Sequence, residues 1–229
     1  MGSDHVKRVA AHKAWPIKRK GMKFVAKSSP GPHSLETGIP LSILLKEVLN
    51  YSSTTREIKK IISMNEIKID GKPRKDLKFP VGIFDTIELA NSNESFRVIF
   101  NRRGKLGLVK INKEEASIKP CKIIGKKILG GKLQLNLYDG KNIIASNGEY
   151  KVGDTLLLSL PEQKINKHLQ LGKKSAIYLI GGKHVGEAGN IEDIIENKII
   201  YRDQKGNLIE TSKKYAFVIG DSKPLITIG

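Results

Sequence analysis

Residues 41–74 read LSILLKEVLNYSSTTREIKKIISMNEIKIDGKPR, and this stretch decides the fold that we expect. Leucine and valine recur at positions i, i+3, i+4, i+7 and i+8 from Leu41, which is the period of one buried helical face. Thr54 and Glu57 then match the capping box at the start of a helix, and isoleucines at 58, 61 and 62 supply its apolar face. The stretch therefore predicts two short helices, one beginning at Leu41 and one entered through Thr54.

A short β segment is expected after the two helices. Residues 67–69 alternate apolar and polar side chains, and the Asp70-Gly71 pair that follows is typical of a tight turn between strands. A further strand is expected at 85–89. Opposite the isoleucines of the second helix, and in the turn, the side chains are basic, which favours contact with an anion.

Positive charge extends outward from this stretch in both directions, and the formal net charge of the 229 residues is +18. Residues 1–40 hold eight basic and two acidic side chains but no sustained apolar period, so we expect an extended basic arm. Such an arm is suited to phosphate contacts and base stacking. A solvated terminus and a membrane-surface segment are the alternatives, the second disfavoured because no apolar helical face is present. The arm residues with a candidate RNA contact are Lys7, Arg8, Lys13, Trp15, Lys18, Arg19 and Lys20.

From residue 96 onward the sequence predicts β structure, because short runs rich in branched residues alternate with Gly or Asp-Gly turns. Arg102 and Arg103 lie in the turn before Gly104 and should project toward a polyanion, although solvated loop residues are the alternative. The fold class is therefore α+β, predominantly β, built from small modular domains. The expected strands are 96–100, 105–111, 118–124, 133–138, 143–145 and 156–160, with a boundary at 166–172.

Composition argues against several classes of function. The single cysteine, Cys121, forms neither an internal disulfide nor a thiolate metal cluster, and the five histidines lack metal-ligand spacing, so we expect no metal and no cofactor. No apolar run reaches the roughly 18 residues that cross a bilayer, and no P-loop is present, so neither a membrane nor a small-molecule substrate is expected. The adjacent carboxylates at 114–115 and 192–193 should be solvated surface.

The helix pair, the string IKIDGK at 67–72 and the string DTIEL at 85–89 resemble the S-four RNA-binding fold, also called the alpha-L motif, over about residues 41–90. In that family the second helix and the following turn face RNA. The resemblance implies no such contact for Lys46 and Lys78. It implies phosphate and sugar contacts for Thr55, Arg56, Lys59, Lys60, Lys68, Lys72 and Arg74.

Residues 178–191 order a strand, a glycine-rich turn and a second strand, and they resemble the KOW motif of small SH3-like barrels in ribosomal proteins and transcription-elongation factors. Glu187 lies where many members of that family are basic. The resemblance implies a partner-facing turn made by Gly182, Lys183, His184, Gly186 and Gly189.

The order of these modules resembles the archaeal and eukaryotic-type small-subunit ribosomal protein four family, the S-four-e family. The resemblance implies a cytoplasmic structural protein of the small ribosomal subunit that is not an enzyme and whose partners are ribosomal RNA and neighbouring ribosomal proteins. An RNA-modifying enzyme and a KOW-type translation or transcription factor stay open as alternatives. The expected domains are a basic arm (1–40), an S-four-like domain (41–95), a central β-rich domain (96–172) and a KOW-containing SH3-like barrel (173–229).

Overall fold

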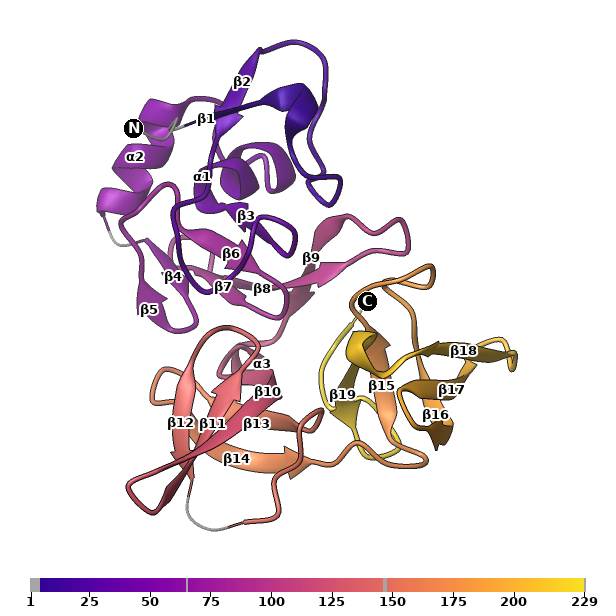
Figure 1. Cartoon of the computed structure of the whole chain (residues 1–229). Coiled ribbons are helices and arrows are strands. Elements are labelled where there is room, and N and C mark those ends of the chain that lie inside the picture. Colours follow the sequence, from indigo (N-terminus) through magenta and orange to yellow (C-terminus); the bar gives the residue numbers. More distant parts are fainter. Residues whose placement is uncertain (1–4, 65, 146–147, 229) are drawn as a thin grey trace. The chain divides into compact units, whose positions relative to one another are not determined.

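The computed structural model describes residues 5–64, 66–145 and 148–228, which divide into two compact units (Figure 1). Unit 1 contains the described residues up to Phe100 together with Gly104–Ser117. Unit 2 contains Asn101–Arg103 and the described residues from Ile118 onward. Strands far outnumber helices in both, which confirms an α+β fold that is mainly β.

The basic N-terminal segment is folded, and the expectation of an extended arm is wrong for residues 5–40. Within it Trp15, Ile17 and Val25 are buried. These buried residues lie in turns and in short two-stranded ribbons, where apolar side chains do not recur at a regular interval. For this reason the sequence shows no apolar period. Within the segment β1 (His5–Lys7) pairs with β2 (Phe24–Ala26). The segment is joined to the rest of unit 1 by β3 (Gly38–Pro40), which pairs with β6 (Pro80–Gly82).

Both predicted helices are present. The first, α1 (Leu41–Ile43), continues directly into a π-helical turn at Leu44–Val48, and leucines 41, 44 and 45 are buried. The second, α2 (Thr55–Ser63), begins at the predicted capping box. The Glu57 N–H donates to Thr54 Oγ1 at 3.3 Å, and the Thr54 N–H donates to the Glu57 carboxylate at 3.3 Å.

A five-stranded antiparallel sheet completes unit 1 and runs past the expected boundary at residue 95. The boundary falls inside β8, which pairs with β7 on one side and with β9 on the other. Asp70 and Gly71 both have positive φ, 52° and 71°, as a tight hairpin turn requires. The elements, in sheet order, are β5 (Lys72–Pro73), β4 (Ile67–Ile69), β7 (Thr86–Leu89), β8 (Glu94–Phe100) and β9 (Leu106–Ile111), followed along the chain by α3 (Lys113–Ala116).

Unit 2 contains two five-stranded antiparallel sheets. The expected boundary at 166–172 overlaps the last strand of the first sheet, and this strand was missed because its apolar residues are few. The first sheet has the order β12 (Asn142–Ala145), β11 (Lys132–Leu137), β10 (Ile118–Leu129), β13 (Thr155–Ser159) and β14 (Lys164–Leu169). The second has the order β18 (Leu208–Ser212), β17 (Lys198–Asp203), β16 (Ala188–Ile195), β15 (Ala176–Leu179) and β19 (Ala216–Gly220).

Apolar packing joins the two sheets of unit 2. Leu157 of β13 and Leu169 of β14 belong to the same buried cluster as Ile177 and Val218 of the second sheet. Cys121 lies in the core of the first sheet, as expected, at 2% exposure. The expected central domain (96–172) and barrel (173–229) are therefore not separate: residues 118–172 share a core with the barrel, and residues 104–117 belong to unit 1.

Candidate nucleic-acid interface

One face of α2 is basic and exposed while the other is buried. Ile58 and Ile62 are only 1% and 2% exposed and anchor the helix. Thr55 and the three cations of the helix are all exposed, and none of the three cationic side chains makes an ion pair within the part of the chain that the structure describes. These cations, Arg56, Lys59 and Lys60, are free to meet an anion without loss of core packing.

The β4–β5 turn lies next to α2 in sequence and adds further cations. Lys68 is exposed between two isoleucines that are buried at 0% and 1% exposure, and Lys72 is exposed as well. Arg74 is half-buried, and its guanidinium carbon lies 4.5 Å from the centre of the Phe79 ring, a cation–π contact. Arg74 is therefore oriented by the protein itself.

Lys78, for which the sequence implied no RNA contact, lies in the structure beside Lys59 and Lys75. A concavity of about 560 Å³ is lined by Lys59 of α2 and by Lys75 and Lys78 of the loop that follows β5. Asp76 lines the hollow as well, so three cations face one carboxylate, and the remaining positive charge favours an anionic ligand.

In the N-terminal segment the structure separates exposed cations from structural ones. Lys7, Lys13, Lys18 and Lys20 are exposed, as an RNA contact requires. Arg19 is half-buried, and its guanidinium donates to several backbone carbonyls, including that of His12 at 2.8 Å. Arg19 therefore stabilises the backbone of the N-terminal segment through these hydrogen bonds.

Arg8 and Trp15 are part of the fold, and the prediction that they contact RNA is wrong. Arg8 is 5% exposed and forms a bidentate ion pair with Glu47 of the first helical segment, one arm at 3.1 Å. Its guanidinium also donates to the Lys18 carbonyl at 2.7 Å. Trp15 is 2% exposed and its indole N–H donates to the Gly38 carbonyl at 2.8 Å. A side chain with these internal partners is unavailable for stacking on a base.

The glycine-rich turn between β15 and β16 is organised by Glu187, which sequence reasoning gave no role. The Glu187 carboxylate lies 3.1 Å from His184 Nδ1 and accepts a hydrogen bond of 3.2 Å from the Tyr201 hydroxyl. Burial, followed by the Glu187 charge, raises the pKa of Tyr201 above its ordinary value. Lys183 remains exposed, whereas His184 is partly engaged by the protein.

Two glycines of this region have structural reasons to be glycine. A Cβ on Gly189 would lie 2.3 Å from the Arg202 carbonyl oxygen of the paired strand, so Gly189 is required by the sheet, and its partner-facing role stays a prediction. Gly186 has φ +82°, and a Cβ there would lie 2.5 Å from the Asn101 carbonyl oxygen. Gly182 is exposed at φ +83°. Arg102 and Arg103, which follow Asn101 in unit 2, are exposed and so fit the prediction of a contact.

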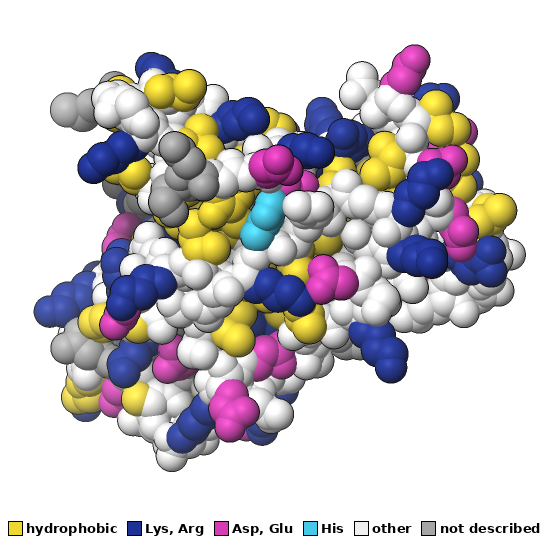
Figure 2. Space-filling view, turned by 90° about the horizontal axis from the view of Figure 1, so that it is seen from below, with side chains coloured by type: hydrophobic (Ala, Val, Ile, Leu, Met, Phe, Trp, Pro, Cys, Tyr) yellow, Lys and Arg dark blue, Asp and Glu magenta, His cyan; other side chains and the backbone are white. Residues whose placement is uncertain are grey.

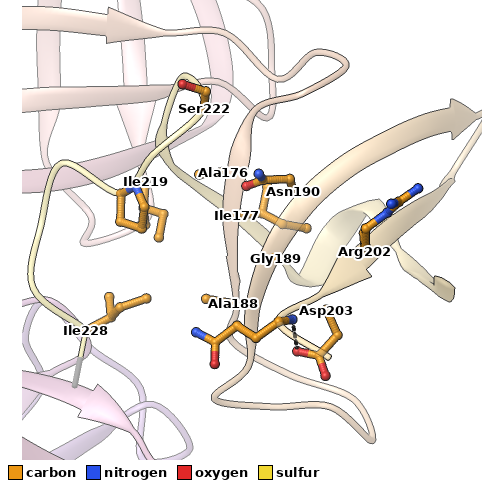
Figure 3. Close-up of a pocket in the computed structure, with 12 residues that line it drawn as sticks. Ala176, Ile177, Ala188, Gly189, Asn190, Arg202, Asp203, Ile219, Ser222 and Ile228 are labelled. Carbon is orange, nitrogen blue, oxygen red and sulfur yellow. Dashed lines mark hydrogen bonds between the residues drawn. The ribbon is translucent and has the colours of Figure 1, made fainter. Parts of the chain in front are cut away.

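A small pocket of about 250 Å³ lies in the second sheet of unit 2 (Figure 3). Asn190 and Arg202 line it from the paired strands β16 and β17, beside Ile177 and Ile219. Arg202 is already paired with Glu192 at 2.9 Å. Among the described residues that line the pocket there is no histidine, cysteine or lysine, and its volume is below the roughly 300 Å³ usual for small-molecule sites.

Several charged groups are buried for structural reasons that the sequence did not show. Arg97 is 0% exposed and pairs with Glu115, which corrects the expectation that both carboxylates at 114–115 are solvated. Lys122 donates to the carbonyls of Lys213, Lys214 and Ala216, the last at 2.6 Å. Burial and then the nearby Lys213 lower the pKa of Lys122 to about 8.

Basic side chains also lie outside these elements. On the face in Figure 2, Lys and Arg side chains are spread over the surface with Asp and Glu between them. Within residues 5–64, 66–145 and 148–228 no group of three His, Cys, Asp or Glu side chains could hold a metal ion, and no helix could span a membrane.

Comparison with known proteins places these features in context. A profile of the Ribosomal family S4e matches residues 92–165, and a profile of the RS4NT (NUC023) domain matches residues 1–36. The chain is 42% identical over 233 residues to the small ribosomal subunit protein eS4 of Methanocella arvoryzae, covering 99% of this chain and 98% of that protein. It is 40% identical over 239 residues to the protein of the same name from Methanocaldococcus jannaschii, covering 98% and 97%. The crystal structure of the 30S ribosomal protein S4e from Thermoplasma acidophilum is similar with a TM-score of 0.71 at 34% identity, over 84% of this chain and 99% of that chain.

Proposed function

Because the chain belongs to the S4e family of small-subunit ribosomal proteins, we propose that it binds small-subunit ribosomal RNA directly, mainly through the cations of α2 and of the β4–β5 turn. Its role as a structural protein of the small ribosomal subunit follows from 40–42% identity over nearly the whole chain. We propose that it has no catalytic activity and that it acts in the cytoplasm. Its proposed partners are ribosomal RNA and neighbouring ribosomal proteins.

The observation that carries the proposal is the division of α2 into two faces. Ile58 and Ile62 are buried and pack the helix against the rest of unit 1. The cations on the opposite face have no internal partner among the described residues. Folded RNA presents phosphates and 2′-hydroxyls on its surface, so these lysines and Arg56 would recognise shape and backbone in preference to base sequence.

The turn between β15 and β16 supports a second contact. Lys183 is exposed at its tip, and the hydrogen bonds to Glu187 fix the backbone that carries it. We propose that this turn and the five-stranded sheet around it act as a KOW-like module, with Gly182, Lys183 and His184 nearest the partner.

The proposal is tested by the triple variant R56A/K59A/K60A. Each phosphate contact contributes about 0.7–0.9 to the slope of log affinity against log salt, so three lost contacts should reduce that slope by about 2–3. The control is K151A/K174A/K205A, which removes the same charge from exposed lysines of unit 2 that make no ion pair with any residue that the structure describes. Filter binding to small-subunit RNA is the assay, with an unfolding curve to show that both variants are folded. Equal salt slopes for the two variants would refute the assignment to α2.

Sedimentation distinguishes the structural role from the alternative of a KOW-type translation or transcription factor. A structural protein of the subunit should remain at about one copy per small-subunit RNA after a high-salt wash of a cell extract. A transient factor would be removed by the wash.

A further inference from the structure

A cleft of about 560 Å³ lies in unit 1 between two segments that are distant in sequence, residues 16–22 and 46–53. We propose that this lysine cleft, lined by Pro16, Lys18, Lys20, Met22, Lys46 and Glu47, binds one nucleotide of an RNA strand, with lysines on its phosphates and Met22 and Pro16 against its ribose or base. The inference rests on the proposed function and joins two candidate residues of the N-terminal segment, Lys18 and Lys20, to Lys46, for which the sequence implied no contact.

The charge of the cleft is positive and uncompensated. Lys18, Lys20 and Lys46 make neither an ion pair nor a side-chain hydrogen bond within the described part of the chain. The carboxylate of the cleft, Glu47, has both oxygens engaged by Arg8. Three cations with no acid left to neutralise them surround the hollow, and a phosphodiester carries the charge that they lack.

Arg8 is the positioning residue of this site. Arg8 is buried. It forms an ion pair with Glu47, the neighbour of Lys46, and donates a hydrogen bond to the backbone carbonyl of Lys18 at 2.7 Å. The same guanidinium therefore fixes both walls relative to each other within unit 1. Preorganised walls reduce the entropy lost when a ligand binds.

An apolar contact completes the site. Met22 is 58% exposed although it is a large hydrophobic residue, and it lines the cleft beside Pro16. A methionine side chain adapts its shape to a flat or irregular partner, so it suits a ribose or the face of a base. A volume of about 560 Å³ falls within the usual range of about 300–1,000 Å³ for sites that hold a small ligand.

The test uses the full chain and small-subunit RNA, and compares K18A/K20A/K46A with the charge-matched control K151A/K174A/K205A. The cleft variant should bind at least tenfold more weakly than the control and reduce the salt slope by about 1–2, since the contacts to the two phosphodiesters that flank the nucleotide are lost. M22S should lower affinity but leave the salt slope unchanged, because Met22 carries no charge. All three variants should unfold at the denaturant concentration of the parent, since the mutated side chains are exposed or half-exposed.

Binding of the cleft variant equal to that of the control would overturn the proposal. So would normal RNA binding combined with loss of the variant from reconstituted subunits, because an acidic protein segment would then be the occupant. The proposed function fails separately: it fails if the parent does not bind the RNA, whereas the cleft alone fails if R56A/K59A/K60A weakens binding and K18A/K20A/K46A does not.

Discussion

Trp15 offers the sharpest test of the folded N-terminal segment. The structure buries its ring and bonds its indole N–H to the Gly38 carbonyl at 2.8 Å. We expect Trp15→Phe to lower the free energy of unfolding of unit 1 by about 0.5–1.5 kcal/mol for the lost hydrogen bond. Trp15→Ala should lower it by about 3–5 kcal/mol, because the removal of a buried aromatic ring also leaves a cavity.

The assay is urea unfolding of the protein without RNA, followed by far-UV circular dichroism. The chain supplies one native reporter for each unit, since Trp15 is the single tryptophan and lies in unit 1, and Cys121 is the single cysteine and is buried in unit 2. In the parent, Trp15 fluorescence follows the unfolding of unit 1. In the variants, pulsed thiol labelling of Cys121 should keep the parent midpoint while the dichroism transition of unit 1 moves to lower urea.

Lys13→Ala is the matched control because Lys13 is exposed on the same segment. A surface substitution of this kind should change stability by no more than about 0.5 kcal/mol. The reasoning is refuted if Trp15→Ala unfolds at the parent's urea concentration and loses RNA affinity, since Trp15 would then act as a stacking residue in an arm that is not folded on unit 1.

Three further predictions concern residues whose structural role is known only from the structure. Gly189→Ala should destabilise unit 2 by about 1–3 kcal/mol in thermal unfolding, because its Cβ would lie 2.3 Å from the Arg202 carbonyl oxygen; Gly125→Ala, with nearest contact at 3.6 Å, should change little, and equal effects would argue against the close approach. Glu115→Ala should cost about 3 kcal/mol or more because it leaves Arg97 buried without its carboxylate, whereas the exposed Glu114→Ala should be nearly neutral. The pKa of Lys122 is lowered from 10.5 to about 8, so above pH 8 the unfolded chain holds more protons than the folded chain and stability should rise with pH until about 10.5. This rise, on the order of 2–3 kcal/mol, should be absent from Lys122→Met, and an identical pH profile for parent and variant would contradict it.

The sequence predicted the elements whose cause is local. The leucine period from Leu41 and the Thr54–Glu57 capping box act within one or two helical turns, and both helices are found where these signals indicate. Strands of unit 2 were predicted for the same reason, since the runs of branched residues and the Gly or Asp-Gly turns that end them are neighbours in sequence. The expected strands at 133–138 and 143–145 are an example: they correspond to β11 and β12, and the Asp-Gly turn between them has Gly140 at φ +74°.

Features whose cause lies far away in the chain were missed. Arg8 reads as a cation in a basic run, and nothing near it in sequence shows that Glu47, 39 residues away, neutralises it. Glu115 meets Arg97 across 18 residues, and Gly189 is required by a carbonyl on the neighbouring strand. Lys46 gained its candidate role in the same way, because only the fold places it across the lysine cleft from Lys18.

These buried charges leave the surface charge of the protein almost untouched. Among the described residues four basic side chains are buried, Arg8, Arg97, Lys119 and Lys122, and four acidic ones, Asp70, Asp85, Asp139 and Asp154. Burial removes both signs in equal number, so the excess that makes up the net charge of +18 stays on side chains that solvent or RNA can reach. The buried cations that stabilise the fold are therefore not the exposed cations of α2 that we propose for RNA binding. For this reason salt should weaken RNA binding steeply while it changes unfolding little, because exposed charges are screened more strongly than buried pairs.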